Sequence, residues 1–151
     1  MSHSRFVAIT AILLASGCQY RRDCSSPVRR TMHVDPELVD TAKVAANEWR
    51  KMTGGGETIN ILTPIFREIP IAGETNVRFG PTPPGTSGIY YPHHRTAFIH
   101  PQYRLNIDVM MHELGHAMTV PHHGGPDTIM HPSIIGLNHD PATCNHLCCL
   151  P

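Results

Sequence analysis

The chain has 151 residues, with 12 lysines and arginines against 12 aspartates and glutamates, so its formal charge at neutral pH is zero. This balance excludes the strong basic field of a nucleic-acid-binding protein, and it offers no field for steering highly charged substrates. The length suits one domain with a single core, which we expect to act as a monomer.

Residues 1–17 have the pattern of an export signal that is removed from the mature protein. Arg5 gives a positive start, and the largely apolar run that follows is too short for a permanent membrane anchor. Cys18 comes directly after Leu-Ala-Ser-Gly, a junction that resembles a bacterial lipobox. We therefore expect lipidation of Cys18 and anchoring in the bacterial envelope, in the outer membrane if the host has one. The alternative is ordinary signal-peptidase cleavage, followed by secretion.

Residues 18–34 are expected to form an N-terminal arm, and residues 35–151 the folded domain. Asp35 and Pro36 are suited to open a long helix with one apolar side, and the glycines at 54–56 to end it. Short strand-like segments follow, separated by turns rich in proline and glycine, at residues 58–66, 76–79, 89–91 and 96–99.

A second helix is predicted from Ile107 to Met118, because its apolar residues recur with helical spacing. Asn106 is suited to cap its N-terminus, and Asp108 to occupy its first turn. His112 and His116 are four residues apart and therefore lie on one face of the helix. Both imidazoles can reach one zinc ion from that face.

Glu113 follows the first histidine and therefore lies beside the metal, not on it. From that place its carboxylate can act as a general base on water that the metal acidifies. No glutamate follows Glu113, and Pro121 stops the helix, so a histidine just beyond it is the best third ligand. We prefer His122, with His123 as the alternative. Three nitrogen ligands and an open fourth position are what a catalytic zinc site needs.

The segment from His112 to Pro132 reads HELGHAMTVPHHGGPDTIMHP. It resembles the signature of the metzincin zinc metalloproteases, and within them the matrixin branch, which is H-E-x-x-H-x-x-G-x-x-H followed by a methionine-bearing turn. The resemblance implies three zinc ligands, a general base and an apolar residue beneath the metal, which are His112, His116, His122, Glu113 and Met130 respectively. The rest of the chain agrees only in the order of its elements.

Thr119 stands where the metzincins have glycine, a residue that accepts a positive φ. Two outcomes follow from this difference. Either the chain turns at a strained Thr119, or it turns differently and His123 becomes the third ligand. The pro-segment cysteine motif that keeps matrixins latent is missing from the sequence.

Four cysteines remain beyond Cys18, namely Cys24, Cys144, Cys148 and Cys149. In an exported chain they suggest disulfides, with three possible connectivities. Cys144 and Cys148 are one turn apart on a predicted C-terminal helix, which is too far for an unstrained bridge. We therefore expect a bond from Cys24 to one of the last cysteines. A second metal site made by Cys144, His146 and Cys148 is the alternative.

These features predict a compact α+β domain that is similar to the metzincin catalytic domain. The resemblance implies a zinc-dependent endopeptidase with one catalytic Zn²⁺ and a peptide or protein substrate. An extended peptide is expected to pair with a strand edge at residues 89–91 or 96–99. A non-proteolytic zinc amide hydrolase and a catalytically silent, zinc-stabilised envelope binding module are the alternatives. The intact Glu113 favours turnover over the silent module.

Overall fold

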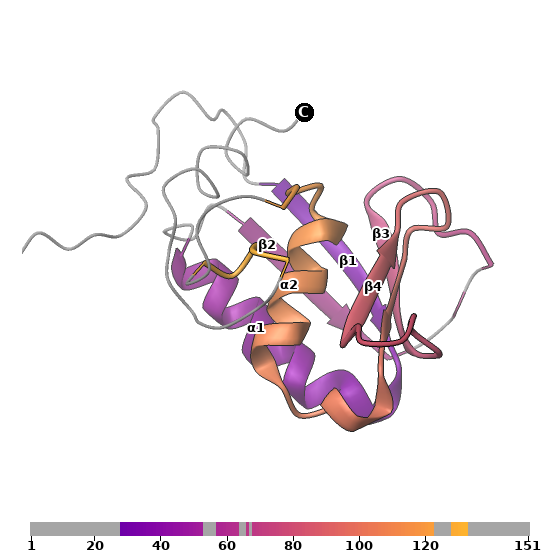
Figure 1. Cartoon of the computed structure of the whole chain (residues 1–151). Coiled ribbons are helices and arrows are strands. Elements are labelled where there is room, and N and C mark those ends of the chain that lie inside the picture. Colours follow the sequence, from indigo (N-terminus) through magenta and orange to yellow (C-terminus); the bar gives the residue numbers. More distant parts are fainter. Residues whose placement is uncertain (1–27, 53–56, 64–65, 67, 123–127, 133–151) are drawn as a thin grey trace, which may run out of the picture.

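A five-stranded sheet forms the centre of the computed structural model, which describes residues 28–52, 57–63, 66, 68–122 and 128–132 (Figure 1). In sheet order the strands are β2 (Glu57–Leu62), β1 (Val28–Val34), β3 (Glu74–Phe79), β5 (Thr96–Ile99) and β4 (Gly88–Tyr91). The first four run parallel, whereas β4 runs antiparallel to β5 at one edge. The fold is therefore an α/β arrangement with a mixed sheet. This differs from the α+β domain that we expected, in which helices and strands are segregated along the chain.

Two helices cover one face of this sheet. The chain leaves β1 through a 3₁₀ turn, η1 (Pro36–Leu38), and the helix α1 (Val39–Met52) then carries it back to the parallel strand β2. A second 3₁₀ turn, η2 (Pro101–Tyr103), leads from β5 into the helix α2 (Ile107–Ala117). The two helices lie side by side in Figure 1, with α1 packed against β2 and α2 against β4 and β5.

The core lies between these helices and the sheet. The strands contribute alternate residues to it, as the period of two requires, which are Met32, Val34, Val77, Ala97 and Ile99. Trp49 of α1 is fully buried, and its indole Nε1–H donates to the carbonyl oxygen of Met111 in α2 at 2.9 Å. Truncating a buried tryptophan to alanine costs about 3–5 kcal/mol, so Trp49 is a main contact between the two helices.

Asp35 does not cap the first helix, although the sequence predicts that it opens there. Its side chain makes no capping hydrogen bond, and α1 begins only after η1. Instead its Oδ2 accepts from the backbone N–H of Phe79 at 2.7 Å, and its own N–H donates to the carbonyl of Val77 at 2.9 Å. Asp35 therefore ties the end of β1 to the end of β3.

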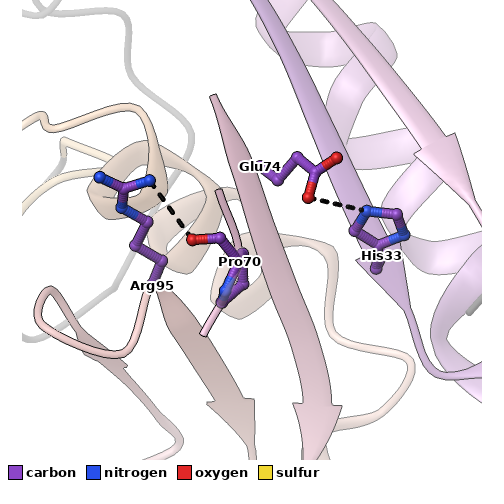
Figure 2. A network of polar contacts seen from close by, with 4 residues as sticks. All are labelled: His33, Pro70, Glu74 and Arg95. Atoms are coloured by element: carbon purple, nitrogen blue, oxygen red, sulfur yellow. Dashed lines mark hydrogen bonds and ion pairs between the residues drawn. The ribbon is translucent and has the colours of Figure 1, made fainter. Parts of the chain in front are cut away.

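Two polar contacts join segments of the sheet and its turns (Figure 2). His33 alternates with the core residues of β1, so it points away from the helices. Its Nε2 lies 3.6 Å from Oε2 of Glu74 on β3, and Arg95 donates from Nη1 to the carbonyl of Pro70 at 3.4 Å. The first contact joins β1 to β3, and the second holds the segment before β3 against the turn between β4 and β5.

The sheet departs from the sequence-based expectations in two places. Residues 28–34, the last part of the expected arm, form β1 near the middle of the sheet. Residues 96–99 form an internal strand of the described sheet, so of the two segments that were expected to pair with a peptide, only residues 89–91 lie in an edge strand. No helix among the described residues is long and apolar enough to span a bilayer. The expected signal peptide, Cys18, the other four cysteines and the predicted C-terminal helix fall outside the described residues.

Candidate metal centre

The helix α2 carries the first part of the candidate site. Asn106 caps it as predicted, because its side-chain Oδ1 accepts from the backbone N–H of Val109 at 3.1 Å. Apolar residues of α2 enter the core, while His112, Glu113 and His116 face a cleft of about 750 Å³ between α2 and β4. The cleft is also bordered by the loop that precedes β4.

A left-handed turn at Thr119 ends α2. Thr119 has a φ of +69°, and its N–H donates to the carbonyl of His116 at 2.8 Å. The N–H of Val120 donates to the carbonyl of Gly115 at 2.9 Å, which completes a Schellman motif. Of the two outcomes that the sequence left open, the structure has the strained one. The turn reverses the chain and brings His122 back to the histidines of α2.

The imidazoles of His112, His116 and His122 converge on one point. The Nε2–Nε2 distances are 3.0 Å from His112 to His116, 3.1 Å from His112 to His122, and 3.0 Å from His116 to His122. Tetrahedral zinc with bonds of about 2.0–2.1 Å separates its ligand nitrogens by about 3.3 Å, so the observed spacing fits a single ion. Among the described residues, these three histidines form the group of side chains that could hold a metal ion.

Two backbone carbonyls fix the protonation of the rings on α2. His112 donates from Nδ1–H to the carbonyl of Ile129 at 2.7 Å, and His116 from Nδ1–H to that of Val120 at 2.8 Å. Because a carbonyl oxygen only accepts, each ring has its proton on Nδ1 and a lone pair on Nε2. Two lone pairs 3.0 Å apart cannot hydrogen-bond to one another, but both can bind the same cation. Metal-binding histidines are commonly oriented by such carbonyls.

Desolvation favours the neutral form of these imidazoles, although His122 is exposed. Desolvation lowers the pKa of His112 to about 4, against a weaker opposing contribution from its hydrogen bond to Ile129. Desolvation is also the main cause that lowers the pKa of His116 and of His122. A neutral imidazole is the form that binds a metal, so the rings need not lose a proton at neutral pH.

Glu113 lies beside the three histidines and is almost fully buried, with 3% of its surface exposed. Burial raises the pKa of its carboxyl group to about 8. Its side chain packs against the backbone of Gly88 in β4, where an added Cβ would lie 2.7 Å from Oε1 and 2.8 Å from Cγ. No described residue hydrogen-bonds to Oε2. Because Gly88 has no side chain, it leaves room for the side chain of Glu113.

Met130 lies in a turn that packs against α2. The turn is closed by the N–H of His131, which donates to the carbonyl of Thr128 at 3.1 Å. Met130 is fully buried, and a Cβ added to Gly115 would collide with its sulfur. The same turn supplies the Ile129 carbonyl that orients His112. The predicted methionine turn thus contacts the helix of the candidate site.

Several contributions could not be read from the sequence. The carbonyls of Val120 and Ile129 are backbone groups with no sequence signature. The sequence shows Gly88 and Gly115 but not why each must be a glycine, because the side chains that approach them come from distant parts of the chain.

Other histidines stay outside the cluster. His93 and His94 are exposed in the turn between β4 and β5. His100 is half-buried, and its Nδ1 accepts from the N–H of Gln102. His123, the alternative third ligand, lies outside the described residues.

In comparisons with known proteins, no family model, curated protein or solved structure matches the chain. The geometry alone therefore characterises the site. An H-E-x-x-H helix followed by a third converging histidine is compatible with a zincin-like metal site.

Proposed function

We propose that this protein is a zinc-dependent endopeptidase of the metzincin type, closest to the matrixin pattern. The observation that carries the proposal is the convergence of three Nε2 atoms within 3.0–3.1 Å of one another, next to a buried carboxylate. His112, His116 and His122 would hold the ion, and Met130 would form the apolar floor beneath it. Zinc in this place would act as a Lewis acid that polarises a carbonyl and acidifies water.

Glu113 would move the proton in this reaction. Its carboxylate would accept a proton from the attacking water and pass it to the nitrogen of the leaving amine. Burial favours the neutral form of Glu113, whereas a nearby divalent cation favours the carboxylate. These opposing influences bring its pKa towards the working pH, as a group that must both accept and donate a proton requires.

The strand β4 supports a peptide as the substrate. It is the last strand at its edge of the described sheet, and its residues Gly88, Ile89 and Tyr90 line the cleft. No described strand pairs with its outer side, so an extended chain could add to the sheet there. Such pairing would place a peptide bond over the histidines and Glu113.

The test combines zinc analysis with digestion of a mixed peptide library. Glu113→Gln should keep about one zinc per chain, while hydrolysis falls by roughly 10²–10⁴, the range for losing an acid–base group. Glu37→Gln, which changes an exposed glutamate of η1, is the matched control and should leave both unchanged.

Three results would reject parts of the proposal. Loss of zinc from Glu113→Gln would make Glu113 a ligand instead of a base. Hydrolysis of other amides without peptide cleavage would favour a non-proteolytic hydrolase. Zinc binding without any turnover would favour a silent binding module.

We also propose that the protein is exported and anchored by a lipid on Cys18. The support is the sequence before Cys18, with its positive start, apolar run and small residues. A multiply acylated N-terminus holds a protein firmly to a membrane, whereas a single chain binds only marginally.

A further inference from the structure

The wall of the cleft carries an acid that the proposed reaction does not use. Asp108 lies on the cleft face of α2, one turn before His112. Among the described residues that line the cleft, Asp108 and Glu113 are the acidic ones, and none is a lysine or an arginine. Apart from the candidate metal ligands and Glu113, Asp108 is therefore the charged group that a bound substrate would meet there.

Asp108 has no partner of its own in the described part of the chain. Its side chain is half-buried, yet no described residue gives it a hydrogen bond or an ion pair. The N-terminus of α2 does not need Asp108 as a cap, because the side chain of Asn106 already accepts from the N–H of Val109. Its place in the first turn of α2 favours the negative charge through the helix dipole.

We propose that Asp108 selects peptides with lysine or arginine close to the cleaved bond. This inference rests on the proposed endopeptidase function. One helical turn separates Asp108 from His112, or about 6 Å along the axis. A lysine or arginine side chain on a residue beside the scissile bond spans that distance. Tyr103, from the 3₁₀ turn that precedes α2, also lines the cleft, and its ring would pack against the methylene stem of such a side chain.

The experiment uses pairs of peptides that differ at one position near the cleaved bond. One member carries arginine and the other citrulline, which has nearly the same shape without the charge. The zinc-loaded wild-type protein should show a kcat/KM about tenfold higher for the arginine peptide, as one charge-assisted hydrogen bond provides. The preference should shrink as salt is added, because Asp108 is partly exposed.

Asp108→Asn should abolish this preference and leave the citrulline peptide cleaved at nearly the wild-type rate. Asp40→Asn is the matched control, since Asp40 occupies the first turn of α1, away from the cleft. It should keep the tenfold preference. Binding of both peptides to zinc-loaded Glu113→Gln, with and without Asp108→Asn, gives the same ratio without turnover.

Each other outcome has its own meaning. If the wild-type protein cleaves both peptides equally, the inference is wrong and the endopeptidase function stands. If Asp108→Asn slows both peptides to the same extent, Asp108 supports the helix instead of selecting substrate, and the inference is wrong again. If neither these peptides nor a mixed library is cleaved, the proposed function fails, and the inference fails with it.

Discussion

Replacing Thr119 by glycine should stabilise the protein. Thr119 follows the last turn of α2 with a φ of +69°, a region that a side chain with a Cβ seldom occupies. Its side chain is exposed, so its removal takes little from the core. The two hydrogen bonds of the Schellman motif come from backbone N–H groups, and they persist when the side chain is shortened.

The expected gain follows from two opposing contributions. The left-handed conformation costs a residue with a Cβ roughly 1–2 kcal/mol, and glycine avoids this cost. Glycine also gives the unfolded chain more freedom, which lowers the free energy of unfolding by roughly 0.4–1 kcal/mol. The net gain is about 0.5–1 kcal/mol, or a rise in Tm of about 2–4 °C for a domain of this size.

Thermal unfolding of the zinc-loaded variants measures the effect. Thr119→Ala keeps the Cβ and should give no such gain, and Thr119→Asn should fall between the two because asparagine tolerates this conformation. Thr58→Gly is the control, since Thr58 is exposed in β2, and among the non-glycine residues described only Thr119 and Arg95 have a positive φ.

Glycine in a strand should destabilise by roughly 0.5–1 kcal/mol, so the two substitutions should act in opposite directions. If Thr119→Gly and Thr58→Gly lower the Tm alike, the left-handed turn at Thr119 is wrong. Peptide cleavage by Thr119→Gly should stay within about twofold of the wild type, because the turn keeps its shape.

Four further predictions concern the site and the anchor. His122→Ala should weaken zinc binding far more than His123→Ala in a chelator competition, and the reverse order would make His123 the third ligand. Gly88→Ala should displace the Glu113 carboxylate and lower kcat by about 10–100-fold with zinc retained; unchanged kinetics would contradict the close contact. In the metal-free protein folded Glu113 keeps a proton that the unfolded chain has lost, so its contribution to the free energy of unfolding should fall by about 1.5 kcal/mol from pH 6.5 to 8. The lowered pKa values of His112, His116 and His122 act in the opposite direction and mainly below pH 6.5, so the difference between the wild type and Glu113→Gln in urea titrations isolates the Glu113 contribution, and no difference would contradict its raised pKa. Cys18→Ser should abolish labelling by a fatty-acid analogue and release the protein from bacterial membranes, whereas an unlabelled, soluble wild type would mean simple secretion.

Local spacing predicted most of α2 and its site. The cap at Asn106, the helix itself and the approach of His112 to His116 depend on neighbouring residues, and the structure confirms them. The choice of His122 required more, because it depended on how the chain turns at Thr119. A threonine carries no signal for a left-handed turn, so the sequence left the turn open. The structure has a left-handed Thr119, and the choice of His122 over His123 stays a prediction.

The order and direction of the strands could not be predicted in the same way. β1 has polar or charged residues on both of its faces, among them Arg30, Thr31 and His33, so its sequence does not alternate clearly. Its place in the sheet comes from pairing with β2 and β3, which follow it in the chain. The contact of Gly88 with Glu113 likewise depends on how β4 packs against α2, which neither segment encodes alone.

Trp49 is the single tryptophan of the chain, and its indole is bonded to the carbonyl of the residue that precedes His112. It is also close to Gly115, where an added Cβ would lie 3.0 Å from Cζ2. The protein thus carries a single tryptophan fluorophore, which can be excited apart from its four tyrosines and is in contact with the helix that bears two of the three histidines. Its emission spectrum and quenching by acrylamide should follow the docking of that helix during refolding, or after chelation, without any attached dye.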